Sequence, residues 1–226
     1  MAIPRHVAFI VGGSATYVQT AGVSLDAAYE RKFDVVLETL ERCIARNVPI
    51  TSFLLLPREI EKYGDYPRVV QGVERFLARL AHWPGLATYK VRIKVMGHWY
   101  NLPGTLVDAV KDVLERTKDN DGFFCNIFLN YDGRQEIVDA VRLLGRKMLA
   151  AELDPQVVSA EHVREALYSN VVPPDIIIKT GMSHSLRGFL LWDSPEAELH
   201  MTGRPWQEFD AAQLDTAIAV WNRSRQ

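Results

Sequence analysis

The 226-residue sequence has little of what marks the specialised classes of protein. Its 26 lysines and arginines face 28 aspartates and glutamates, so a formal charge of −2 leaves no basic excess for a nucleic-acid backbone. The two cysteines, Cys43 and Cys125, lack CxxC spacing, and we interpret them as reduced core thiols of a cytoplasmic protein. No apolar run approaches the roughly 20 residues of a membrane helix. Composition therefore predicts a cytoplasmic globular protein that binds no nucleic acid.

The sequence also lacks internal repeats, low-complexity tracts and linkers rich in proline, glycine or serine. Hydrophobic residues make up 48% of the chain, and a chain of this length can bury a core without disulfides. We therefore expect a single domain over residues 1–226.

Short apolar runs alternate with helical patterns along the chain. The runs are typical of strands buried on both faces, and the alternating run over Tyr89–Met96 is typical of a strand near a sheet edge. The predicted strands are His6–Val11, Ile50–Leu56, Tyr89–Met96, Phe123–Leu129, Asp175–Lys179 and Phe189–Trp192. The predicted helices cover residues 24–44 (with Ser24 as N-cap), Val69–Leu86, Pro103–Arg116, Gln135–Leu149, Ala160–Tyr168 and Asp210–Asn222. This alternation predicts an α/β fold with a central, mostly parallel sheet flanked by helices.

Ligands of such sheets bind beyond the carboxyl ends of the strands, so the loops that follow the strands are the candidate sites. These loops are Gly12–Tyr17, Pro57–Tyr66, Gly97–Asn101, Asn130–Arg134 and Thr180–Gly188. Gly12, Gly13 and Ser14 can present backbone amides to a phosphate at the next helix, and Lys179 adds a cation at the same edge. A turn that needs positive φ explains the glycines equally well, and a strand-end lysine is as often simply solvated.

Other polar residues in or near these loops have weaker patterns. His98 and His184 have no partner at a metal-ligand spacing, although they can be a catalytic pair. Asp132 lies in a tight turn, where aspartate is common for conformational reasons alone. Glu196 and Glu198 can bind a divalent cation, but an exposed helix explains them equally well. The residues alone predict an α/β protein that binds an anionic ligand.

Three stretches of the chain together resemble the cis-prenyltransferase family, whose type member is undecaprenyl diphosphate synthase. Pro4–Ile10 is similar to the family's opening P-x-H-V-A-I-I, and Leu129–Arg134 to its N-Y-G-G-R motif. The stretch from Pro174 through Phe189–Trp192 to Asp210 resembles the family pattern PDLLIRTGG…NFLLWQ…AELYFT…WPDFD without a gap. The resemblance implies a sheet beside a hydrophobic tunnel, and condensation of an allylic diphosphate with isopentenyl diphosphate, using Mg²⁺, by a protein that is typically a dimer.

The residues that hold the substrates in that family are largely replaced. The family's first loop has D-G-N-G-R-W, where this chain has the sequence GGSATY over Gly12–Tyr17, so the metal-positioning aspartate and a diphosphate-holding arginine are missing. Leu25 and Tyr29 replace an arginine and a histidine of the next helix. By position, the resemblance assigns diphosphate binding to Gly12, Gly13, Ser14, Lys179, Ser185 and Arg187, and Mg²⁺ binding to Glu198, contributed across the dimer.

Two hypotheses of different class explain these losses. A missing electrostatic donor costs about a hundred- to a thousand-fold in rate, and several are missing, so we favour a catalytically depleted subunit that supports an active cis-prenyltransferase partner. The alternative is a repurposed prenyltransferase with altered diphosphate ligands that condenses or cyclises allylic diphosphates. Gly22–Asp26 resembles the lavandulyl-type synthases, which supports it. A binder of prenyl lipids without catalysis is a third possibility.

Both main hypotheses share their ligands and their candidate residues. We expect isoprenoid diphosphates as ligands, Mg²⁺ as the candidate cofactor, and Asp132 and His184 as the candidate catalytic residues. The expected assembly is a dimer, of two copies or with a homologue, that makes peripheral contact with a membrane.

Overall fold

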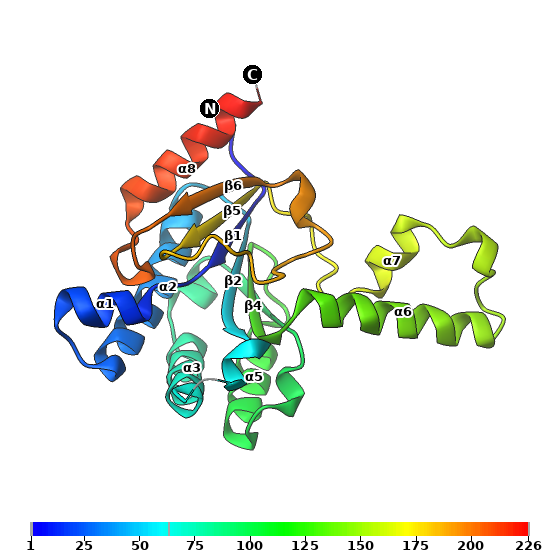
Figure 1. Ribbon diagram of the computed structural model, residues 1–226, viewed down its shortest axis with the longest axis horizontal. Coiled ribbons are helices and arrows are strands. Elements are labelled where there is room, and N and C mark those ends of the chain that lie inside the picture. Colours follow the sequence, from blue (N-terminus) through cyan, green and yellow to red (C-terminus); the bar gives the residue numbers. More distant parts are fainter. Residues whose placement is uncertain (1, 63, 226) are drawn as a thin grey trace.

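The structure is a computed structural model that describes residues 2–62 and 64–225, so the predicted loop over Pro57–Tyr66 is described except at residue 63. Over these residues a parallel sheet forms with the strand order β3-β4-β2-β1-β5-β6 (Figure 1). The strands are β1 (His6–Ile10), β2 (Ile50–Pro57), β3 (Val91–Met96), β4 (Phe123–Tyr131), β5 (Ile176–Thr180) and β6 (Glu198–Thr202). The predicted α/β class and the sheet flanked by helices are confirmed, and β3 lies at a sheet edge as its alternation predicts.

The helices follow the predicted order with two differences: α1 lies where the sequence predicts a loop, and one predicted helix is divided in two. They are α1 (Ser14–Ala21), α2 (Leu25–Ala45), α3 (Tyr66–Ala81), α4 (Gly85–Thr88), α5 (Gly104–Thr117), α6 (Gly133–Leu149), α7 (Ala160–Ala166) and α8 (Ala211–Ser224). Ser24 caps α2, as predicted, by accepting from the Ala27 amide at 3.2 Å. The predicted helix over Val69–Leu86 is instead divided between α3 and α4, because Pro84 has no amide hydrogen to continue the helix. Among the described helices, none combines the length and the apolar character needed to cross a bilayer.

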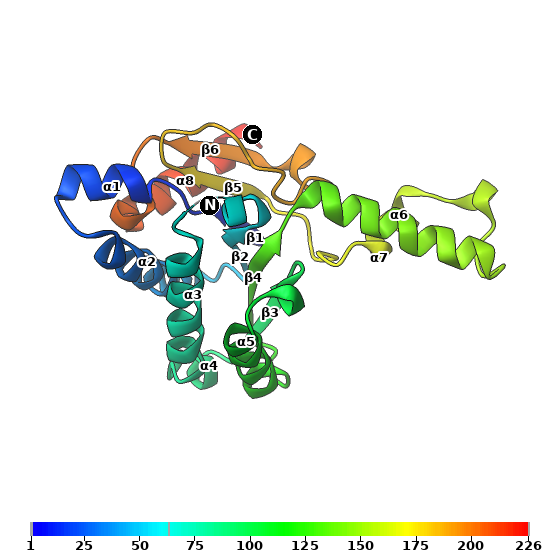
Figure 2. The same cartoon turned by 60° about the horizontal axis from the view of Figure 1, so that its bottom comes forward.

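One face of the sheet carries the larger core. Helices α2, α3, α5 and α8 cover this face (Figures 1 and 2). At its centre Phe9 stacks on Phe53 with ring centroids 5.0 Å apart, and Trp206 stacks on Phe209 at 5.1 Å. The opposite face has a smaller cluster, and α6 and α7 extend away from the body of the sheet on that side (Figure 1). The buried aromatic side chains fix the positions of β1, β2 and the segment before α8.

The sixth strand differs from the prediction. Phe189–Trp192 forms turns instead of a strand: Phe189 and Leu190 are buried in the smaller cluster, and Leu190 has a left-handed φ of 46°. The edge strand is β6, where Leu199 and Met201 point outward and are exposed. A short apolar run fits a buried turn as well as a strand, so the pattern alone cannot separate the two.

The strand register brings the predicted loops together. Ile10 at the end of β1 lies opposite Leu54 of β2 on one side and Lys179 of β5 on the other. The segments that follow β1, β2 and β5 therefore emerge side by side at the carboxyl edge of the sheet, where ligands of parallel sheets bind.

Candidate anion-binding site at the carboxyl ends of the strands

Two adjoining cavities open at this edge and share Pro57 and Arg187. One, of about 330 Å³, lies between β1, β5, α1 and α2; we call it the lysine cavity because Lys32 and Lys179 line it. The other, of about 340 Å³, lies between the ends of β2 and β4 and the Ser185–Leu191 segment; we call it the arginine cavity because Arg58, Arg134 and Arg187 line it. Each cavity has room for a small anionic ligand.

The two glycines after β1 allow the chain to pass close to β5. Gly13 has a φ of 96° and is the N-cap of α1, so the interpretation as a turn with positive φ holds for it. Gly12 donates its amide to Thr180 Oγ1 at 3.0 Å. A Cβ at position 12 would lie 2.7 Å from the Thr180 carbonyl oxygen and 2.9 Å from Lys179 Nζ, so only glycine fits there.

Lys179 is a buried cation, only 3% exposed, although it stands at the end of β5. Its ammonium group donates to the carbonyl oxygen of Thr180 and lies against Gly12. Burial lowers the pKa of Lys179 from its ordinary value. The structure thus gives the lysine a buried place in the cavity wall and contradicts the interpretation of a simply solvated side chain.

Lys32, from α2, is a second buried cation of this cavity and is 5% exposed. Its Nζ lies 3.5 Å from the Leu55 carbonyl oxygen and within 6 Å of two ring centroids, at 5.9 Å from Tyr29 and 5.5 Å from Phe33. Burial lowers the pKa of Lys32 to about 8, an effect that the more distant carboxylate of Asp65 partly opposes. Sequence reasoning missed Lys32; the signal was a lysine four residues after Ala28, on the apolar face of a predicted helix.

The charge of the lysine cavity is positive. Asp65 is the carboxylate among its described lining residues, and it accepts a hydrogen bond from the Tyr29 hydroxyl. Burial and this carboxylate both raise the pKa of Tyr29. Against Asp65 stand Lys32, Lys179 and Arg187, so the described lining has an excess of two positive charges. A cavity with this balance favours an anion.

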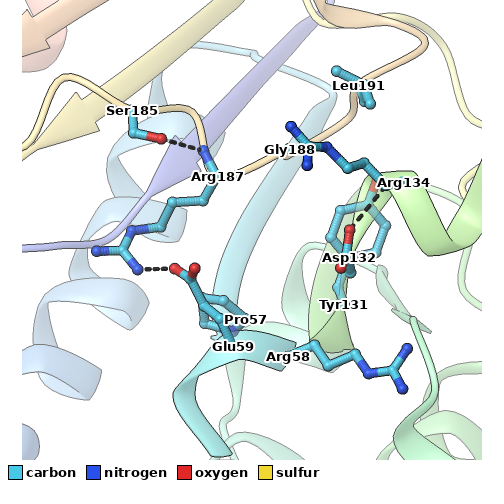
Figure 3. A pocket seen from close by; sticks show the side chains of 10 residues that line it. All are labelled: Pro57, Arg58, Glu59, Tyr131, Asp132, Arg134, Ser185, Arg187, Gly188 and Leu191. Atoms are coloured by element: carbon cyan, nitrogen blue, oxygen red, sulfur yellow. Dashed lines mark hydrogen bonds and ion pairs between the residues drawn. The ribbon is translucent and has the colours of Figure 1, made fainter. Parts of the chain in front are cut away.

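The arginine cavity is shown in Figure 3, where the Arg187 guanidinium forms an ion pair with Glu59. Ser185 Oγ accepts from the Arg187 amide at 3.1 Å. Asp132 is the N-cap of α6 and accepts from the Arg134 amide at 2.9 Å, while the Arg134 side chain reaches toward the segment around Gly188 (Figure 3). Arginine side chains with a fork of donors suit phosphate or diphosphate oxygens.

Most of the predicted site residues come together here. Gly12, Gly13, Ser14 and Lys179 line the lysine cavity, Ser185 and Asp132 line the arginine cavity, and Arg187 lines both. His184 is exposed and lies outside both linings. Glu198 is at the amino end of β6, opposite Ile176, about 13 Å along the strand from the carboxyl edge. Within one protomer Glu198 therefore lies away from the site, and its role across a dimer stays a prediction.

The residues at this site do not fit Mg²⁺. Within residues 2–62 and 64–225, no cluster of three or more His, Cys, Asp or Glu side chains could hold a metal ion. Position 12 has no side chain, Lys179 Nζ lies where one would be, and Asp65 is held by Tyr29. Magnesium needs carboxylate or other oxygen ligands in near-octahedral geometry, and this cavity presents ammonium groups in their place.

Comparison with known proteins places the chain in a family. The family model described as "Putative undecaprenyl diphosphate synthase" matches residues 10–226. An isoprenyl transferase of Oceanobacillus iheyensis is 28% identical over 227 residues, covering 99% of this chain and 89% of that protein. A tritrans,polycis-undecaprenyl-diphosphate synthase (geranylgeranyl-diphosphate specific) of Archaeoglobus fulgidus is 30% identical over 224 residues, covering 97% and 89%.

The fold comparison agrees with the sequence comparison. The crystal structure of lavandulyl diphosphate synthase from Lavandula x intermedia, in complex with dimethylallyl diphosphate, matches with a TM-score of 0.92 at 22% identity, over 97% of this chain and 95% of that one. The resemblance identified from the sequence is confirmed: the chain belongs to the undecaprenyl diphosphate synthase family of prenyltransferases, the cis-prenyltransferases.

Proposed function

We propose that this protein is a cis-prenyltransferase with altered diphosphate ligands, which condenses or cyclises allylic diphosphates. The observation that supports it is the pair of adjoining cationic cavities that share Arg187. Condensation of two prenyl diphosphates needs two anion sites side by side, and a subunit that only supports a partner needs neither. Beside Lys179, which the sequence predicts as a cation of this edge, Lys32 supplies a second buried positive charge.

The lysine cavity suits the allylic diphosphate whose carbon–oxygen bond breaks. As that bond breaks, negative charge grows on the departing diphosphate, and cations fixed nearby stabilise the transition state. Lys32, Lys179 and the first amides of α1, after Gly13, are the groups that hold this diphosphate. Apolar side chains from β1, β2 and the segment after β2 contact the prenyl tail and exclude water: Ile10, Leu54, Leu55 and Ile60.

The arginine cavity suits the second substrate, with its diphosphate near Arg134 and Arg58. Arg187 stands between the cavities and contacts both ligands, which fixes the distance between the two prenyl groups. Asp132 and Ser185 position the walls of this cavity through hydrogen bonds to the backbone. The hydrophobic tunnel implied by the resemblance remains part of this proposal.

The test is turnover by the purified chain alone. Dimethylallyl, geranyl and farnesyl diphosphate are each incubated with the protein, with and without isopentenyl diphosphate, and products are identified by mass spectrometry. We expect a condensed or cyclised prenyl product, reduced about a hundred- to a thousand-fold in Lys179→Met. Absence of product with every combination overturns the proposal.

The second candidate is the catalytically depleted subunit of a two-chain enzyme. The absence of a carboxylate at Gly12 favours it, and Glu198 agrees with it as a residue contributed across a dimer. So do the outward side chains of edge strand β6, Leu199 and Met201, which another chain can cover. This candidate predicts that the chain alone forms no product. When a complete cis-prenyltransferase from the same genome is co-expressed, the two chains should co-purify and the complex should form product.

A further inference from the structure

We infer that the lysine cavity binds its diphosphate without a divalent metal ion, because the ammonium groups of Lys179 and Lys32 supply the positive charge. This inference rests on the proposed function, since it concerns how the same cavity holds a prenyl diphosphate. The inference concerns only whether binding of the diphosphate requires a metal ion, and it makes no claim about the reaction that follows.

The first argument is the contact between Lys179 and Gly12. A Cβ on residue 12 would lie 2.9 Å from Lys179 Nζ and 2.7 Å from the Thr180 carbonyl oxygen, so an aspartate at position 12 would displace the ammonium group from its present position. The chain therefore carries a fixed cation beside the backbone of the first loop, in the volume that a metal-positioning side chain would need. Nζ donates to the Thr180 carbonyl oxygen, and an ammonium group has two further donors for a ligand.

The second argument is that Lys32 is buried and forms no ion pair with residues 2–62 or 64–225. An apolar cavity wall disfavours an ammonium group strongly unless a charged or hydrogen-bonding partner offsets the lost hydration. Among the described residues, the contacts of Lys32 Nζ are the Leu55 carbonyl oxygen, at 3.5 Å, and the two aromatic rings, while the more distant Asp65 carboxylate is held by the Tyr29 hydroxyl. These contacts offset little of the hydration that the Lys32 ammonium group loses on burial. An anion in the adjacent cavity would complete its coordination, which explains why a lysine stands among apolar neighbours.

The third argument is the beginning of α1. Its N-cap is Gly13, which has no side chain to accept from the first amides, and Ser14 and Ala15 line the cavity. Free amides at a helix N-terminus add to the field of the two lysines. A diphosphate ester carries roughly three negative charges near neutral pH. Lys32 and Lys179 supply two positive charges around it, and Arg187, which also pairs with Glu59, lines the same cavity against the single carboxylate of Asp65 among the described lining residues.

The experiment is isothermal titration of the purified full chain with inorganic pyrophosphate at pH 7, once in excess EDTA and once in Mg²⁺. We expect binding in EDTA, and equal or weaker apparent affinity in Mg²⁺ because the metal competes for pyrophosphate in solution. Lys32→Met and Lys179→Met should each weaken binding at least about tenfold. Lys111→Met, at an exposed position of α5, is the matched control and should bind like the wild type.

The outcomes separate this inference from the proposed function. Binding that needs Mg²⁺, or wild-type affinity in both lysine variants with circular dichroism unchanged, overturns the inference. If product forms but pyrophosphate binds only with Mg²⁺, the proposed function stands and the inference falls. If pyrophosphate binds in EDTA but no product forms from any substrate, the inference stands and the proposed enzyme activity falls.

Discussion

Replacing Lys32 by methionine is expected to stabilise the protein while it weakens the site. Methionine keeps a long flexible side chain among the apolar neighbours and removes the buried charge. Burial lowers the pKa of Lys32 from 10.5 to about 8, and this gap corresponds to about 3 kcal/mol, an upper estimate of the cost of holding the charged form in the folded protein. At pH 7 Lys32→Met should therefore raise the free energy of unfolding by up to about 3 kcal/mol.

The pH dependence of the stability gain in Lys32→Met shows whether removal of the buried charge causes it. Between about pH 8 and pH 10.5 the folded wild type binds fewer protons at Lys32 than the unfolded chain, so raising the pH stabilises the wild type at this residue. The advantage of Lys32→Met should thus be full below pH 8 and shrink as the pH rises through that window. Urea unfolding followed by tryptophan fluorescence at several pH values measures it, with Lys111→Met as the exposed control. A variant less stable than the wild type at pH 7, or an advantage independent of pH, would refute the reasoning.

Three further predictions concern the same cavity and its supports. Pyrophosphate affinity should fall as the pH rises through about 8, where the pKa of Lys32 lies, and titrations of Lys32→Met should lack that part of the decline. Gly12→Ala should destabilise the protein by about 1–3 kcal/mol in thermal unfolding and weaken pyrophosphate binding, because its Cβ would meet the Thr180 carbonyl oxygen at 2.7 Å and displace Lys179. Asp210→Ala, which removes the capping box of α8, should lower stability by about 1 kcal/mol with pyrophosphate affinity unchanged.

The parts of the fold that the sequence predicts well are those with a strong local pattern. β1 and β5 are apolar runs buried on both faces, and α2 has a serine cap followed by a regular apolar stripe. α1 has no buried residue and so no apolar stripe, which is why the sequence predicts a loop there. β6 alternates over only five residues at an exposed edge. The nearby Phe189–Trp192 is more apolar, so the sequence predicts the last strand there and not at β6.

The candidate site shows a different limit. Gly12, Gly13 and Lys179 could be found because parallel strands bring their carboxyl ends together whatever the intervening sequence. That Lys179 Nζ occupies the volume beside Gly12 depends on side-chain packing between residues far apart in the chain, which no local pattern records. Lys32 is visible in the sequence only as an exception to an apolar stripe, and such an exception becomes informative when the stripe is known to border a cavity.

A fixed cation and a recruited metal ion neutralise a diphosphate with different consequences for the protein. A metal ion arrives with its substrate, so the free protein need not bury its charge. A buried lysine is present at all times. Holding Lys32 in its charged form costs at most about 3 kcal/mol of folding free energy, which is a large fraction of the 5–15 kcal/mol free energy of unfolding of typical proteins. Stability alone would favour an apolar residue there. The presence of Lys32 beside Lys179, in a cavity without a metal-binding carboxylate cluster among the described residues, therefore argues for an anionic ligand that both lysines contact.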